Sequence, residues 1–120
     1  MKTILVTDDD RDVRAIIRMR LEAARYRILE ASDGQSALEL AQNEHPDLLL
    51  LDMTMPGISG VEVVERLRGN PATAHIPVML ISGAEEIADK QFALSVKAND
   101  YLVKPIDGKE LLERVRSLLG

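Results

Sequence analysis

Three groups of ionisable residues in this sequence are of the types that phosphoryl chemistry requires. Asp52 closes an apolar run of four leucines, and the acidic run Asp8–Asp10 follows the short apolar stretch Ile4–Val6. A single lysine, Lys104, follows another apolar stretch, Tyr101–Val103. A carboxylate at the end of so apolar a segment costs desolvation free energy unless a nearby cation offsets that cost. A carboxylate that is retained there despite the cost is a candidate for a covalent role. A buried carboxylate, an acidic pair and one lysine together suggest phosphoryl transfer.

The composition excludes several other classes of protein. The 120 residues include 20 acidic and 15 basic side chains, and the net charge of −5 argues against a nucleic-acid backbone as the main partner. Without cysteine the chain has neither a disulfide framework nor a thiolate metal site. Because no long apolar segment occurs near the N-terminus, we expect no signal peptide, no membrane span and a cytoplasmic location. The size predicts one domain over residues 1–120.

Short apolar runs alternate with amphipathic stretches along the chain, a pattern typical of a parallel sheet covered by helices. The apolar runs predict five strands, near Thr3–Val6, Arg27–Glu30, Asp47–Leu51, Val78–Ile81 and Tyr101–Val103. Two of these runs are continuous rather than alternating, as expected for strands that are covered on both faces. We therefore predict an α/β fold of the flavodoxin-like type, a doubly wound five-stranded parallel sheet in the order 2-1-3-4-5 with five helices.

The predicted helices are marked by apolar spacing and by capping residues. One helical face is formed by Val13, Ile16, Ile17, Leu21 and Ala24. Capping-box spacing predicts three later helix starts, at Ser32 with Gln35, Ser59 with Glu62, and Asp107 with Glu110. A further helix is expected over Glu85–Val96, and Gly69 is expected to end the helix that begins after Ser59.

This topology brings the acidic residues together. In a doubly wound sheet the ligand crevice lies beyond the carboxyl ends of the first and third strands. Asp8 and Asp9 follow the first strand and Asp52 ends the third. Crowded carboxylates raise one another's pKa, and a hard divalent cation relieves this; oxygen ligands without histidine or cysteine favour magnesium. We expect Asp9, Asp52 and a backbone carbonyl just past Asp52 to bind Mg²⁺, with Asp8 acting through a water.

Such a site leaves one oxygen of Asp52 facing a phosphate, and a carboxylate so placed can attack as a nucleophile and form an acyl phosphate. Positive charge from Mg²⁺ and from Lys104 would balance the equatorial oxygens of the transition state. Ser82, at the end of the fourth predicted strand, would offer a hydroxyl to the same phosphate.

Four segments of the chain closely resemble the receiver domain of two-component response regulators, in particular the single-domain chemotaxis-regulator type. The segments are Ile4–Asp10, Leu50–Gly57, Ile81–Ala84 and Asn99–Pro105, and the resemblance extends over the whole chain with matching spacing. It implies that Asp52 is the phosphoacceptor for a histidine kinase or a histidine phosphotransfer protein. The chain would be no conventional enzyme but would catalyse its own Mg²⁺-dependent phosphorylation and dephosphorylation.

The resemblance also implies the roles of single residues. Asp8 and Asp9 match the acidic pair that binds magnesium, and Thr54 matches the position that donates a backbone carbonyl to the metal. Ser82 and Tyr101 match the switch residues, a hydroxyl that follows the phosphate and an aromatic ring that swings inward with it. Lys104 matches the phosphate-binding lysine.

The bond between Lys104 and Pro105 is expected to be cis, since the family's lysine typically precedes its proline in that form. The signal is expected to pass to a downstream protein through the Glu85–Val96 helix, the last strand and the last helix, from a monomer or a phosphorylation-dependent dimer. No direct contact with nucleic acid or membrane is expected.

Some positions depart from the commonest family pattern. Ser59 stands where many members have aspartate, and Lys97 replaces a frequent glycine. A left-handed Lys97 would carry roughly 1 kcal/mol of strain. Ala84 has no polar group to position an attacking water, so we expect slow to moderate loss of the phosphate.

Several residues argue against other functions for this chain. A flavin-binding protein is disfavoured by the acidic residues after the first strand, and a dedicated phosphatase by Thr54, where an acid-base aspartate would be needed. A degenerate receiver that takes no phosphate stays open, as does an excised receiver of a larger regulator with a separate output domain.

For the arginines of the first helix, a solvated face balanced by Asp12 and Glu22 is preferred to a docking patch.

Overall fold

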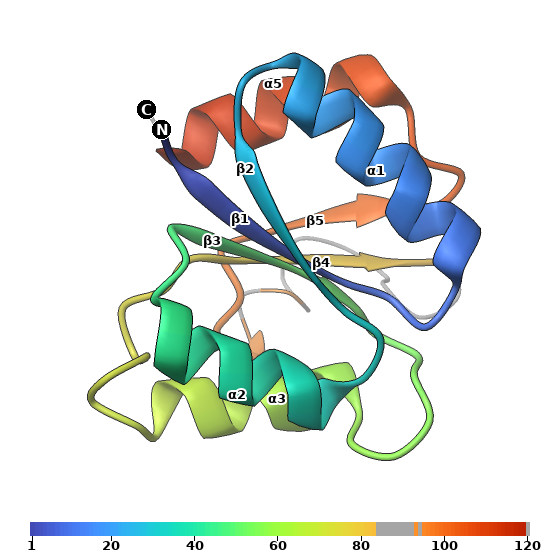
Figure 1. Cartoon of the computed structure of the whole chain (residues 1–120). Coiled ribbons are helices and arrows are strands. Elements are labelled where there is room, and N and C mark those ends of the chain that lie inside the picture. The colour runs from blue at the N-terminus through green and yellow to red at the C-terminus, as the bar shows by residue number, and fades with distance from the viewer. Residues whose placement is uncertain (84–92, 94, 120) are drawn as a thin grey trace.

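A single five-stranded parallel sheet forms the centre of the computed structural model, which describes residues 1–83, 93 and 95–119 (Figure 1). The strand order is β2-β1-β3-β4-β5, which confirms the predicted topology. The strands are β1 (Thr3–Thr7), β2 (Arg27–Ala31), β3 (Leu48–Asp52), β4 (Val78–Ser82) and β5 (Asp100–Val103). Each predicted strand is confirmed, with ends shifted by at most one residue.

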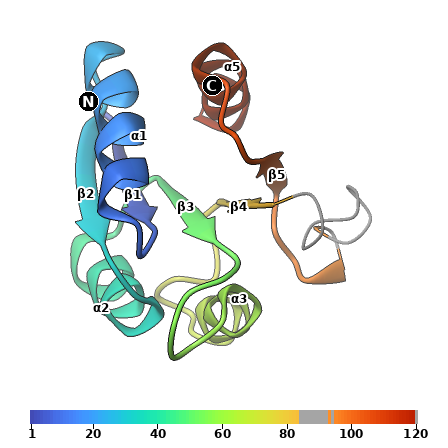
Figure 2. The ribbon, with the colours of Figure 1, turned by 90° about the vertical axis from the view of Figure 1, so that its right-hand side faces the viewer.

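Helices cover both faces of the sheet. The described helices are α1 (Arg11–Ala23), α2 (Gly34–Glu44), α3 (Gly60–Arg68) and α5 (Gly108–Leu119). Seen along the sheet, α1 and α5 lie on one face while α2 and α3 lie on the other (Figure 2). The expected helix over Glu85–Val96 falls largely outside the described residues. Within the described part of the chain, no helix combines the length and the apolar character needed to cross a bilayer.

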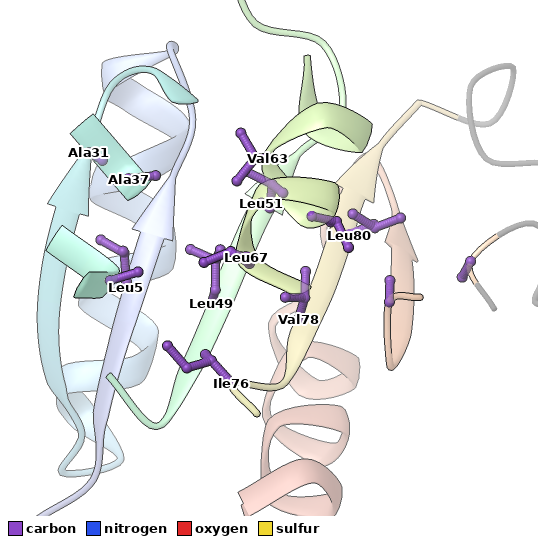
Figure 3. Close-up of a cluster of buried hydrophobic side chains, with 14 residues drawn as sticks. Leu5, Ala31, Ala37, Leu49, Leu51, Val63, Leu67, Ile76, Val78 and Leu80 are labelled. Atoms are coloured by element: carbon purple, nitrogen blue, oxygen red, sulfur yellow. The ribbon is translucent and has the colours of Figure 1, made fainter. Parts of the chain in front are cut away.

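The strand alternation divides the core between the two faces. Leu49 and Leu51 pack with α2 and α3 (Figure 3), whereas Leu48 and Leu50 pack with α1 and α5. All four leucines are fully buried. The continuous apolar run before Asp52 is thus explained, because both faces of β3 are covered.

The first helix buries a narrower stripe than predicted. Ile17 and Leu21 are buried and Val13 packs against them, but Ile16 is 54% exposed. Ile16 lies one position before Ile17, at the edge of the buried stripe, so it is exposed although its spacing placed it on the apolar face.

Capping residues fix where the helices begin. Ser59 Oγ accepts the Glu62 N–H at 3.2 Å, as predicted, and Gly69 caps the other end of α3. The prediction of Ser32 as the cap of α2 is wrong by one residue. Asp33 occupies that position, and its Oδ1 accepts the Ser36 N–H at 2.8 Å. A carboxylate is a strong acceptor at a helix N-terminus, and it is favoured there by the helix dipole.

Candidate functional site

Residues distant in sequence meet at the carboxyl edge of the sheet. Asp8 directly follows β1, Asp52 is the last residue of β3, and Lys104 directly follows β5. Asp8, Asp9 and Asp52 each place a carboxylate oxygen within 4.8 Å of the others. The convergence predicted from the topology is therefore present in the structure.

Two of these carboxylates are buried side by side. Asp8 and Asp52 are each 2% exposed, while Asp9 is open to solvent. Burial, followed by the nearby charge of Asp8, raises the pKa of Asp52, although the Thr54 backbone N–H and Lys104 act in the opposite direction. The pair is thus held in an environment that favours an additional cation.

Lys104 lies between the two buried carboxylates. Its Nζ is 3.2 Å from Asp8 Oδ2 and 3.5 Å from Asp52 Oδ2. Burial by itself would lower the pKa of Lys104, but the carboxylates of Asp8 and Asp52 outweigh burial and raise it. The lysine therefore stays protonated and supplies positive charge directly beside Asp52.

The acidic run divides between the carboxylate group at the sheet edge and the cap of α1. Asp8 Oδ1 accepts the Asp10 N–H at 2.8 Å, and Asp10 Oδ1 caps α1 by accepting the Asp12 and Val13 N–H groups at 2.8 and 3.3 Å. The first turn of α1 thereby fixes the backbone that carries Asp8 and Asp9. Asp10 is thus the N-cap of α1 and belongs to the helix start rather than to the carboxylate group.

The loop after β3 holds the side chain of Asp52. Thr54 donates to Asp52 Oδ1 through its backbone N–H at 3.2 Å and through its Oγ1 at 3.4 Å. The loop returns closely to the strand, since the Gly60 N–H bonds to the Met53 carbonyl at 3.3 Å. Thr54 therefore orients the carboxylate of Asp52, while its carbonyl as a metal ligand stays a prediction.

The two predicted switch residues lie on neighbouring strands. Ser82 is fully buried at the end of β4, and its carbonyl accepts the Lys104 N–H at 2.8 Å. Tyr101 is half-buried on β5, and the Arg114 guanidinium lies 5.6 Å from the centre of its ring. Arg114 also bonds to Asp100 Oδ1 at 2.6 Å. These contacts fix Tyr101 between the core and the surface of α5.

The predicted cis bond is confirmed, since the Lys104–Pro105 peptide bond is cis. Lys97 has a φ of 66°, in the left-handed region, which is the case for which strain at this position is expected. Ala84, to which the slow loss of phosphate was attributed, lies outside the described residues.

The donor set fits magnesium. Three carboxylates contribute oxygens from one edge of the sheet, and hard divalent cations prefer such ligands. The exposed Asp9 leaves one side of the group open to water and to phosphate oxygens, which complete the coordination of Mg²⁺ in many proteins.

Comparison with known proteins identifies the family. A family model described as the response regulator receiver domain matches residues 4–116. The chain belongs to the response regulator receiver family. The fold and the resemblance inferred from the four sequence segments are thereby confirmed.

Solved receiver domains share the structure over nearly the full chain. A putative response regulator from Chloroflexus aurantiacus is 34% identical with a TM-score of 0.92, covering 98% of this chain and 97% of that one. The chemotaxis response regulator CheY4 of Vibrio cholerae is 30% identical with a TM-score of 0.88, and 99% of each chain is covered.

The curated relatives include longer proteins. The probable transcriptional regulator ycf27 of Cyanophora paradoxa is 41% identical over 98% of this chain and 48% of its own length. The phosphate regulon transcriptional regulatory protein PhoB of Pseudomonas aeruginosa is 39% identical over 98% of this chain and 52% of its own. This receiver thus spans about half the length of these relatives.

Sequence reasoning missed the main partner of the α1 arginines. Arg18 bonds to Glu22 at 3.1 Å, in line with the expected solvated face. However, Glu30 on β2 bonds to Arg18 at 2.6 Å and to Arg14 at 3.1 Å. The expectation that Asp12 and Glu22 balance this face is therefore wrong in part. No local spacing signals a partner on another element, so only the packing of α1 against β2 reveals it.

Proposed function

We propose that this receiver takes a phosphoryl group on Asp52 in a Mg²⁺-dependent reaction and signals through a change of conformation. The observation that carries the proposal is the arrangement of Asp8, Asp52 and Lys104, two buried carboxylates with one ammonium 3.2 and 3.5 Å away. Burial of such charged groups costs free energy, and groups of this kind are concentrated at functional sites. The receiver family to which the chain belongs favours phosphoryl transfer as the function of this one.

Asp8, Asp9, Asp52 and the backbone carbonyl of Thr54 are the proposed ligands of Mg²⁺. When bound, the ion supplies positive charge to the oxygens of the incoming phosphoryl group. Asp8 and Asp52 come from buried strand ends, so their positions are set before the ion arrives. Preorganisation of this kind reduces the reorganisation needed during the reaction.

In the transfer step, a carboxylate oxygen of Asp52 attacks the phosphorus of a phosphohistidine on a kinase or phosphotransfer protein. The P–O bond to Asp52 forms as the P–N bond breaks, and the imidazole nitrogen leaves with the electron pair and takes up a proton. The protonated Lys104, 3.5 Å from Asp52, pairs with an oxygen of the transferred group. In dephosphorylation, water attacks the same phosphorus, the P–O bond to Asp52 breaks, and inorganic phosphate leaves as the carboxylate of Asp52 is restored.

The phosphorylated Asp52 carries additional negative charge and acceptor oxygens. Ser82 and Tyr101 are the proposed switch residues because they lie at the end of β4 and on β5, beside Lys104. Their movement would bias an existing two-state equilibrium. The proposed readout surface comprises β5, α5 and residues 85–96, and the active species is a monomer or a phosphorylation-dependent dimer.

The effector is either a separate protein or an output domain of the same polypeptide. Two curated relatives, of which this receiver covers about half the length, are named as transcriptional regulators. For those proteins, an output domain in the same polypeptide is favoured. The match to the chemotaxis response regulator CheY4 covers 99% of that solved chain, which supports the first arrangement. In either case we propose a cytoplasmic location, no direct nucleic-acid contact by the receiver itself and no membrane contact.

The test is phosphorylation by acetyl phosphate, followed by intact-protein mass spectrometry. Wild type with Mg²⁺ should gain one phosphoryl group, and wild type with a chelator should gain none. Asp52→Asn, which retains the size of the side chain, should gain none under either condition. An adduct on Asp52→Asn, or none on wild type, contradicts the proposal and favours a receiver that binds its partner without phosphate.

A further inference from the structure

The side chain of Arg14 connects the end of β2 to the backbone of Asp8. Its Nη1 donates to the Asp8 carbonyl oxygen at 2.6 Å, and its Nε donates to Glu30 Oε1 at 3.1 Å. The Arg14 side chain is only 15% exposed. A planar guanidinium holds two acceptors in a fixed relative geometry, so Arg14 fixes where the Asp8 peptide lies relative to Glu30.

Asp8 is thereby held on several sides. Its backbone N–H bonds to the Ala31 carbonyl at 3.2 Å, its carbonyl accepts from Arg14, and its Oδ1 accepts the Asp10 N–H at 2.8 Å. Its Oδ2 faces Lys104 at 3.2 Å. The backbone contacts of Asp8 are therefore directed to β2 and α1, which leaves its carboxylate to face the site.

The charge of Arg14 is balanced away from the metal site. Glu30 accepts from Arg14 through Oε1 and from Arg18 through Oε2, the latter at 2.6 Å. Hydrogen bonds, first from Arg18 and then from Arg14, lower the pKa of Glu30 despite its partial burial, so Glu30 is ionised at neutral pH. Arg14 consequently acts on Asp8 as a fixed donor rather than as an unpaired cation that would repel Mg²⁺.

We infer that Arg14 is a positioning residue for the metal site, which holds Asp8 in register with Asp52 through the bond from its Nη1 to the Asp8 carbonyl. This inference rests on the proposed Mg²⁺-dependent function. Groups that orient metal ligands without touching the ion contribute about 10- to 100-fold to metal affinity. Glu30 supports the same arrangement by fixing the guanidinium of Arg14.

The test compares Arg14→Lys with Arg18→Lys. Both variants keep the charge and the helix, and both leave a lysine beside Glu30, but only Arg14 contacts Asp8. A point charge cannot hold Glu30 and the Asp8 carbonyl in one rigid fork. Calorimetric titration with Mg²⁺ should therefore show affinity lowered by about 10-fold or more in Arg14→Lys, and unchanged affinity in Arg18→Lys.

A second readout needs no metal. Amide hydrogen exchange should show loss of protection at Asp10, whose N–H bonds to Asp8 Oδ1, in Arg14→Lys but not in Arg18→Lys. Unchanged Mg²⁺ affinity in Arg14→Lys, or equal losses in the two variants, overturns the role of Arg14. Absence of Mg²⁺ binding by wild type would instead contradict the proposed function, so the two failures are distinguishable.

Discussion

The ammonium nitrogen of Lys104 lies 3.2 Å from Asp8 Oδ2 and joins the strand ends of β1 and β5. Without a metal, this lysine is the cation nearest to the buried carboxylates among the described residues. Its charge has opposite effects on the two steps of the proposed reaction. It repels Mg²⁺ in the resting protein, and it stabilises the phosphoryl oxygens once transfer begins.

Replacing Lys104 with methionine should separate these two effects. We expect tighter Mg²⁺ binding, because a neighbouring positive charge is removed, and phosphorylation by acetyl phosphate slowed by about 100-fold. Titration calorimetry and intact mass measured against time give the two quantities. The matched control is Lys109→Met on the exposed surface of α5, which should change neither. Weaker Mg²⁺ binding in Lys104→Met would contradict the proposed charge balance.

The hydroxyl of Thr7, at the end of β1, is buried without a hydrogen-bond partner in the part of the chain that the structure describes. Thr7→Val removes this unsatisfied group with almost no change of shape, and should raise the free energy of unfolding by about 1 kcal/mol. Thr73→Val is the matched control, since Thr73 Oγ1 is buried but donates to the Leu67 carbonyl at 2.9 Å. It should lower the free energy of unfolding by about 1 kcal/mol. Urea denaturation measures both, and a destabilised Thr7→Val would show that the hydroxyl has a partner.

Gly60 allows α3 to begin directly against the loop after Asp52. A Cβ atom there would lie 2.9 Å from both the Asp52 carbonyl oxygen and Met53 Cα, and these backbone atoms cannot move cheaply. Gly60→Ala should therefore lower the free energy of unfolding by about 1 to 3 kcal/mol and slow phosphorylation of the displaced Asp52.

Gly69, at the other end of α3, provides the control for this substitution. Its Cβ would have ordinary contacts and its φ is −82°, so Gly69→Ala should stabilise the protein by about 0.5 kcal/mol. Equal stability of the two variants in urea denaturation would contradict the close approach at Gly60.

The cap of α2 predicts a specific dependence on pH. The Ser36 backbone N–H, followed by the Ser36 hydroxyl, lowers the pKa of Asp33. A carboxyl whose pKa is lower in the folded state stabilises the protein above its unfolded pKa of about 3.9. That contribution is lost as the pH falls through the folded value.

Asp33→Ala should therefore cost about 1 kcal/mol near neutral pH, and less in acid. Asp33→Asn retains the acceptor oxygen and should retain most of the cap at both pH values. Chemical denaturation of the three proteins near neutral and acidic pH checks this prediction. A cost of Asp33→Ala that is independent of pH would show that the charge of Asp33 is not involved.

The sheet and the carboxylate group were predictable from sequence, because both follow from the apolar runs and from the order of the parallel strands. Apolar runs locate the strands, and parallel strands end at a common edge, so Asp8 and Asp52 had to meet. The cis bond before Pro105 followed from the family resemblance and is confirmed, whereas the resemblance left the conformation of Lys97 open, and the structure shows it to be left-handed.

Other features depend on contacts between elements and left no local signal. The pairing of Arg14 with Glu30 and the Asp8 carbonyl requires the packing of α1 against β2. The exposure of Ile16 depends on how far α1 is rotated over the sheet. The cap of α2 is Asp33 rather than the adjacent Ser32, and the sequence alone does not distinguish these two polar residues as caps.

The central claim is that Asp52 is the nucleophile, and trapping of the acyl phosphate tests it most directly. Protein treated with acetyl phosphate and Mg²⁺ is reduced with borohydride, which converts an aspartyl phosphate to homoserine, and is then sequenced by mass spectrometry. We predict homoserine at position 52, and only when both acetyl phosphate and Mg²⁺ are present before reduction. Homoserine at position 8 or 9, or a phosphate that survives reduction on the hydroxyl of Ser82, would contradict the account.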